Sequence, residues 1–151
     1  MAVQIRNTQR LMKLDRKAIV RVTGALLASL KLQDRDLSIL FVNDTTIAAM
    51  NNEFFGKDRP TNVISFSYFD GMPLEAVGDI IISVERAQDE AVKAGIPFYE
   101  RLFDLIVHGL AHIIGYDHVG NKAEARKMRY REKKLMTIVR GQPEFINLIN
   151  G

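Results

Sequence analysis

The sequence predicts an α+β fold, a single domain over residues 1–151 in which a mixed sheet of about four strands packs with about five helices. Short apolar or alternating segments, typical of strands, are concentrated in the first part of the chain, whereas helical periodicity dominates after residue 83. A chain of 151 residues with 47% hydrophobic content is large enough to form one buried core. No repeat, low-complexity tract or Gly/Ser/Pro-rich linker suggests a second domain.

The first part of the chain predicts two strand–helix pairs. Residues 2–6 indicate a short edge strand, and residues 15–30 have the apolar spacing of an amphipathic helix with an aspartate cap. Residues 37–42 (LSILFV) form the next apolar strand. The capping residues 43–46 (NDTT) then begin a helix that runs to about residue 55.

Two further strands follow close together. Residues 63–69 (VISFSYF) alternate aromatic or branched residues with serines, and residues 78–84 (GDIIISV) are apolar and β-branched. Residues 70–73 (DGMP) mark the turn between them.

The rest of the chain predicts three helices. The first covers residues 84–93 and is stopped by Gly95 and Pro97. The second is predicted over Phe98–Ile114 and the third, which is highly charged, over Lys122–Arg140.

The composition restricts the chemistry and the setting of the protein. Because the chain has no cysteine, disulfides and thiolate clusters are excluded, and any transition metal must be held by histidines and carboxylates. The N-terminal segment (MAVQIRNTQR) does not resemble a signal peptide, and charged residues interrupt every apolar run, so we expect a cytoplasmic protein without membrane association. The net charge of +3 weakly favours acidic partners such as nucleic acid, and no oligomeric state is predicted.

A helical wheel over Phe98–Ile114 separates two faces. Arg101, Asp104, His108 and His112 fall on one polar stripe. The opposite arc is apolar and consists of Leu102, Phe103, Ile106, Val107, Leu110, Ile113 and Ile114. The histidines are therefore expected to face away from the core.

The three histidines of the chain predict a metal site. His108 and His112 are four residues apart, so both imidazoles reach the same side of the helix. Gly115 is expected to end the helix in a left-handed conformation and return His118 to the same ion. Three histidine ligands with a fourth position left for water are typical of catalytic zinc. The same imidazoles also suit nickel, copper or iron.

Two acids are candidates for orienting these histidines by hydrogen bonds to their rings, without binding the metal themselves. Asp104 lies one turn before His108, and Asp117 directly precedes His118. The competing interpretations are a solvated helix acid for Asp104 and an ordinary turn residue for Asp117.

The segment HGLAHIIGYDH, which ends at His118, resembles the signature of the YbeY family of zinc-dependent endoribonucleases. Residues 56–66 (GKDRPTNVISF) and 78–83 (GDIIIS) are similar to two further segments of that family, in the same order. The resemblance implies a zincin-like, metallopeptidase-like fold, one zinc ion on the three histidines and cleavage of single-stranded RNA. It also implies a role at the 3′ end of small-subunit ribosomal RNA and in ribosome quality control, with RNA and the ribosome or its small subunit as partners.

The chain departs from that family at one position. Phe55 stands where the family usually has an arginine before the Gly-Lys-Asp segment, so the expected phosphate-binding cation is missing there. Lys57 or Arg59 could supply a substrate-binding charge instead, although both also fit a simple solvated loop.

The expected reaction is metal-assisted hydrolysis of a phosphodiester. The sequence identifies no catalytic residue other than the water on the zinc; Asp117 and a substrate phosphate are both candidates for accepting the proton. The helix Lys122–Arg140 is rich in cations that suit an RNA backbone, although its interspersed Glu124 and Glu132 also fit a solvated helix. These cations are Lys122, Arg126, Lys127, Arg129, Arg131, Lys133, Lys134 and Arg140.

Two other functions remain open at this point. One is a metal-dependent hydrolase of peptides or small esters. Against the peptide version, the residue after the first ligand is Gly109, whereas zinc peptidases with this histidine spacing have a glutamate there as general base. The other is a ribosome-associated factor with structural zinc, for which three protein ligands are one too few.

Overall fold

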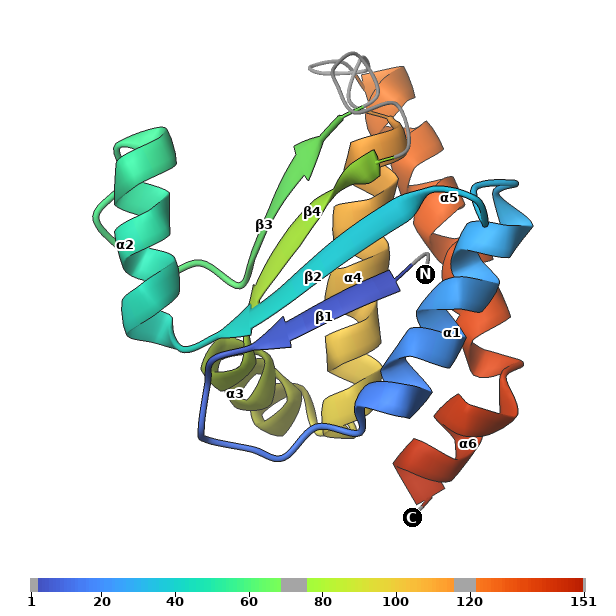
Figure 1. Cartoon of the computed structure of the whole chain (residues 1–151), viewed down its shortest axis with the longest axis horizontal. Coiled ribbons are helices and arrows are strands. Elements are labelled where there is room, and N and C mark those ends of the chain that lie inside the picture. Colours follow the sequence, from blue (N-terminus) through green and yellow to red (C-terminus); the bar gives the residue numbers. More distant parts are fainter. Residues whose placement is uncertain (1–2, 69–75, 116–121, 151) are drawn as a thin grey trace.

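The computed structural model of the chain describes residues 3–68, 76–115 and 122–150. Within these residues, a four-stranded mixed sheet of order β1-β2-β4-β3 is combined with six helices (Figure 1). The first three strands in this order are parallel to one another, and β3 runs antiparallel to β4. In chain order the elements are β1 (Val3–Asn7), α1 (Arg16–Ser29), β2 (Asp36–Val42), α2 (Asp44–Phe55), β3 (Val63–Ser67), β4 (Ala76–Ser83), α3 (Val84–Ala94), α4 (Phe98–Ile114), α5 (Lys122–Arg140) and α6 (Pro143–Asn150).

This architecture confirms the predicted α+β class and the mixed four-stranded sheet. All nine predicted elements occur, with bounds shifted by no more than a few residues. The sequence does not predict helix α6, because its eight residues give only a short periodic signal. The predicted turn over residues 70–73 lies outside the described residues. No helix in the described part of the chain combines the length and apolarity needed to cross a membrane.

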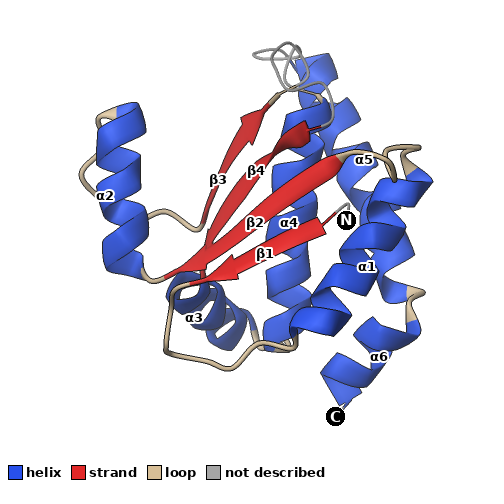
Figure 2. Ribbon diagram, in the orientation of Figure 1, coloured by secondary structure: helices blue, strands red, loops and turns tan. Residues whose placement is uncertain are grey.

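The sheet has two unequal faces. Ile80 and Ile82 of β4 point into the main core, which is completed by α1, α4, α5 and α6, whereas the intervening Ile81 points to the other face. On that second face Ile47 of α2 covers one end of the sheet. Figure 2 shows α2 standing apart from the other helices, close to the end of β2.

Two glycines allow α4 to lie close to the sheet. A Cβ atom at Gly109 would lie 3.0 Å from the Ile80 side chain, and one at Gly78 would lie 3.0 Å from the Ile113 side chain. A Cβ at Gly78 would also collide with the carbonyl oxygen of Phe66. This close packing fixes which face of α4 is buried and therefore which face carries the histidines.

Candidate metal centre

The polar stripe predicted on α4 lies on the exposed side of the helix. The predicted apolar face is buried apart from the partly buried Ile114, and Leu102, Phe103 and Leu110 have 0% exposure. In contrast, the His108 side chain is 43% exposed and His112 is exposed. The two imidazoles are thus accessible from outside the core, as the helical wheel predicts.

The imidazoles of His108 and His112 converge. Their Nε2 atoms are 3.0 Å apart, and the rings meet edge to face with centroids separated by 4.4 Å. The Nδ1 atom of His108 donates a hydrogen bond of 2.7 Å to Oε1 of Glu132 on α5. Because Nδ1 carries the proton in this bond, Nε2 of His108 directs its lone pair toward His112.

This arrangement fits a metal ion. Two imidazole nitrogens that face each other at 3.0 Å share either a proton or a cation. A tetrahedral zinc ion with Zn–N bonds of about 2.0–2.1 Å holds its ligand nitrogens about 3.3 Å apart, close to the observed separation. Partial removal from water and the neighbouring His108 ring lower the pKa of His112, which favours the neutral imidazole that a metal requires.

The third predicted ligand, His118, lies outside the described residues, as does Asp117. Within the described residues no group of three or more His, Cys, Asp or Glu side chains gathers as a metal site; the pair His108 and His112 is what the structure brings together. The expectation of a left-handed Gly115 is wrong, because its φ is −118°. A Cβ atom at Gly115 would lie 2.9 Å from the Arg131 guanidinium, the far end of a flexible side chain, and 3.1 Å from the carbonyl oxygen of Ala111.

The carboxylate that contacts His108 comes from α5 and not from the position expected on α4. Asp104 lies on the same stripe as the histidines, and its ion pair is with Arg101, at 3.8 Å. Burial raises the pKa of Asp104, partly offset by the charge of Arg101. Glu132, which the sequence presents as an ordinary helix acid, makes the contact for which Asp104 is a candidate from sequence alone.

Two hollows meet at His108. A groove of about 750 Å³ between α4 and α5 is lined by His108, Glu132 and several cations, namely Arg101, Arg129, Lys133 and Arg140. A second hollow of about 390 Å³ beside β3 is lined by both histidines. Asn62 borders both hollows, so they form neighbouring parts of one surface around the histidine pair.

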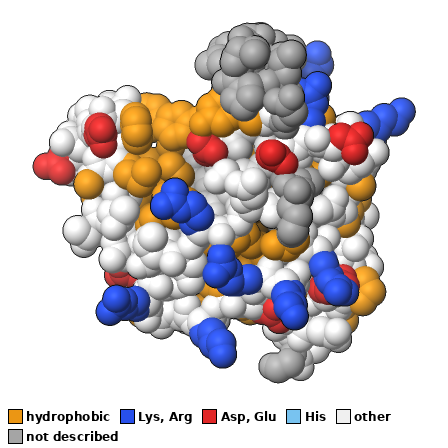
Figure 3. Space-filling model, viewed as in Figure 1, with side chains coloured by type: hydrophobic (Ala, Val, Ile, Leu, Met, Phe, Trp, Pro, Cys, Tyr) orange, Lys and Arg blue, Asp and Glu red, His pale blue; other side chains and the backbone are white. Residues whose placement is uncertain are grey.

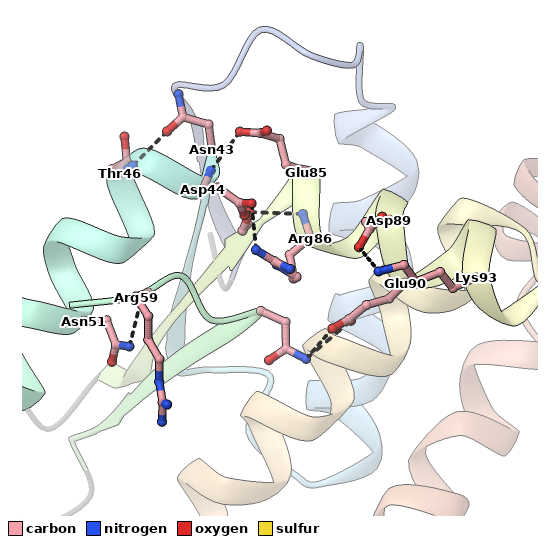
Figure 4. A network of polar contacts seen from close by, with 12 residues as sticks. Asn43, Asp44, Thr46, Asn51, Arg59, Glu85, Arg86, Asp89, Glu90 and Lys93 are labelled. Atoms are coloured by element: carbon pink, nitrogen blue, oxygen red, sulfur yellow. Dashed lines mark hydrogen bonds and ion pairs between the residues drawn. The ribbon is translucent and has the colours of Figure 1, made fainter. Parts of the chain in front are cut away.

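The loop between α2 and β3 supplies the second hollow with a cation. Lys57 lines this hollow together with the histidines. Arg59 is exposed, and its carbonyl oxygen accepts a hydrogen bond of 3.0 Å from Asn51 (Figure 4). Of the two cations predicted from this loop, the structure therefore places Lys57 next to the histidines.

A polar network fixes this loop and α2 to α3 (Figure 4), and Arg101 extends it to α4. The Asp44 carboxylate at the start of α2 accepts hydrogen bonds from Ser83 at 2.6 Å and from Arg86 at 2.9 Å. At the end of the loop, Asn62 donates to Glu90 at 3.3 Å, and Glu90 also accepts a hydrogen bond of 2.9 Å from Arg101 of α4. The network holds the loop beside the histidine-bearing helix.

The sequence does not predict the roles of Glu132 and Asn62. Both depend on how separate elements pack: Glu132 is 24 residues from His108, and Asn62 precedes a strand that pairs with β4. Helical or strand periodicity in the sequence does not reveal either of these long-range contacts.

Comparison with known proteins points to one family. The family model described as Endoribonuclease YbeY matches residues 4–140. Proteins named Endoribonuclease YbeY from Syntrophus aciditrophicus and Geobacter sulfurreducens are each 38% identical to this chain. The alignments cover 95% of this chain and 92% of the first relative, and 92% of this chain and 96% of the second. The solution structure of TM1509 from Thermotoga maritima has a TM-score of 0.66 at 23% identity and covers 94% of both chains, which shows the same fold.

Proposed function

This chain belongs to the YbeY family of endoribonucleases, and on that premise we propose that it is a zinc-dependent hydrolase that cleaves single-stranded RNA. The observation that carries the metal-dependent part is the convergence of two Nε2 atoms at 3.0 Å, with one imidazole oriented by Glu132. The cation-lined groove beside this pair supports a polyanionic substrate.

The residues proposed to hold the ion are His108, His112 and His118. When bound, zinc supplies Lewis acidity toward a phosphodiester oxygen and acidifies a water molecule near neutral pH. The Glu132 carboxylate keeps the proton of His108 on Nδ1 and thereby leaves Nε2 free for the ion. Asp117 and a substrate phosphate are the two candidates for accepting the proton that the attacking water loses.

The positively charged side chains of the groove have a separate role in this proposal. Arg129 and Lys133 of α5 line the same groove as His108, so they can neutralise phosphates that flank the scissile bond. Lys57 lines the second hollow, together with both histidines. From there it can contact the backbone of the RNA strand.

The biological setting we propose is maturation of ribosomal RNA at the 3′ end of the small-subunit RNA, together with ribosome quality control. The substrate would then be presented by the ribosome or its small subunit, in the cytoplasm. Residues 1–151 would act as one metallohydrolase domain.

Peptide hydrolysis is disfavoured by the position of Gly109. This residue is buried, and a Cβ atom there would lie within 3.0–3.2 Å of the Ile80 side chain. The site of a peptidase glutamate is therefore packed against β4.

The proposal is tested by cleavage assays on three substrates: a single-stranded RNA, the same RNA in a duplex, and a peptide panel. Cleavage of single-stranded RNA should disappear on chelation and return when zinc is added. Activity that survives complete chelation, or cleavage of peptides with RNA left intact, would contradict it.

A further inference from the structure

Three phenylalanines form an exposed group between α2 and β3, which we call the phenylalanine cluster: Phe54, Phe55 and Phe66. Phe54 and Phe55 are each 51% exposed, which is unusual for side chains of this size. The Phe66 ring contacts both, edge to face with Phe54 at 5.2 Å and parallel to Phe55 at 6.1 Å with an interplanar angle of 7°. Figure 3 shows hydrophobic side chains gathered on this part of the surface.

The two exposed rings differ in what lies next to them. Phe55 lines the hollow that also contains His108, His112 and Lys57. Phe54 is not among the described residues that line it. Phe54 has the same exposure and also contacts Phe66, and it belongs to the same end of α2. Phe55 thus places an aromatic ring in the same cavity as a metal-binding histidine pair and a cation.

We propose that Phe55 stacks on a nucleobase of the RNA strand next to the scissile bond. This inference rests on the proposed function, since it concerns the same substrate. Aromatic side chains stack on any base, because every base has a π face, and a nearby cation neutralises the phosphate of the same nucleotide. The hollow provides both: Phe55 for the base and Lys57 for the phosphate, beside the imidazoles that would hold the ion.

The Phe55 ring is held in place before substrate arrives. Phe66 packs parallel to it from the sheet, and Phe66 belongs to β3, which is paired with β4. Immediately after Phe55, Gly56 adopts a left-handed φ of 67° and ends α2, so the chain turns into the loop that carries Lys57. A ring already oriented by the protein loses little conformational freedom when a base stacks on it.

The charge of the neighbouring groove favours nucleic acid over a protein as the occupant. Arg129 and Lys133 line the groove that adjoins the hollow at His108. A strand that crosses the histidine pair would meet cations on one side and the Phe55 ring on the other. An apolar protein partner would bring no negative charges to pair with these cations.

The test is a binding titration of the zinc-loaded protein with a cleavage-resistant single-stranded RNA that contains 2-aminopurine, a fluorescent base quenched by stacking. Phe55→Ala and Phe55→Leu should weaken binding about 5- to 100-fold and abolish the protein-induced quenching, since leucine keeps apolar volume but has no π face. Phe55→Trp should retain both. The matched control Phe54→Ala should bind like the wild type.

A second arm uses an RNA that lacks one base next to the cleavage position. Wild-type protein should lose affinity for this RNA, whereas Phe55→Ala should bind the complete and the base-less strand equally. Equal binding by wild type, Phe55→Ala and Phe54→Ala would overturn the inference. So would equal weakening by both alanine variants, or a wild-type dimer that Phe55→Ala dissociates without any change in RNA affinity.

The same proteins separate this inference from the proposed function. Phe55-dependent quenching without any zinc-dependent cleavage would leave the stacking contact standing and contradict the ribonuclease activity. Zinc-dependent cleavage with unchanged RNA binding by Phe55→Ala would contradict the stacking contact alone.

Discussion

The chemistry of single residues in this site depends on partners far away in the sequence. In the proposed metal site His108 would be oriented by Glu132, on another helix, which accepts the hydrogen bond from its Nδ1 atom. The His112 ring is tuned by partial burial and by the neighbouring His108. The ligand types are predictable from sequence, whereas the carboxylate that contacts His108 is not, because Glu132 reaches it only through the packing of α5 against α4.

Replacing Glu132 by glutamine should weaken metal binding. The amide no longer provides a negative charge for the Nδ1 proton of His108, so we expect zinc affinity to fall about 10- to 100-fold. Competition with a chromophoric chelator measures this affinity. Glu144→Gln, which alters an acid on α6 paired with Arg21, serves as the control and should bind zinc like the wild type. Unchanged affinity in Glu132→Gln would rule out the orienting role.

Asp104 predicts a pH effect on stability. Burial raises its pKa, so the folded state holds the carboxyl proton more tightly than the unfolded chain does. The folded state is therefore favoured at low pH and loses this contribution as pH rises through the raised pKa. Asp104→Asn removes the titration, so its Tm relative to wild type should be higher at pH 7.5 than at pH 4. Thermal melts that show the same Tm difference at both pH values would contradict the assignment.

At the scale of elements, the site depends on how closely α4 packs on the sheet. Apolar periodicity or alternation, helix caps and Gly/Pro stops together predict nine of the ten elements, including α4 and α5 with their observed bounds. They do not predict that α4 and α5 lie beside each other or that a groove opens between them. Gly115 shows the same limit: its position at the end of α4 is predictable, whereas its backbone conformation, with a φ of −118°, is not.

Two helical glycines provide a matched test of this packing. Gly109→Ala should destabilise the protein by about 1–3 kcal/mol, because its Cβ would press on Ile80. Gly24→Ala lies in α1, where a Cβ meets no described atom within 4 Å, and should be neutral or stabilising by up to about 1 kcal/mol. Urea unfolding measures both. Equal effects of the two substitutions would show that α4 does not pack as closely as described.

At the scale of the whole molecule, the net charge of +3 does not show how the positively charged side chains are distributed over the surface. Cations of α5 lie on two sides of the helix: Arg129 and Lys133 line the groove at His108, whereas Lys127 and Lys134 line a separate hollow against α1. Counting charges along the sequence could not separate these groups, since all belong to one helix. Arg129 and Lys133, together with Arg140, lie where they can contact a strand held at the histidines.

This division predicts a selective salt effect. Arg129→Ala with Lys133→Ala should weaken binding of single-stranded RNA and reduce the slope of log affinity against log salt by about 0.7 for each phosphate that is no longer neutralised. The double variant Lys127→Ala with Lys134→Ala removes the same charge from the other side of α5 and should leave that slope nearly unchanged. Equal reductions in both double variants would mean that the groove does not guide the RNA.

Zinc content per chain, measured on the proteins used for RNA cleavage, tests the central claim most directly. Wild-type protein should carry about one zinc ion per chain, as expected for a single three-histidine site. His108→Ala, His112→Ala and His118→Ala should each lose the ion and the activity together. A histidine variant that keeps a full complement of zinc and cleaves RNA at the wild-type rate would contradict the account.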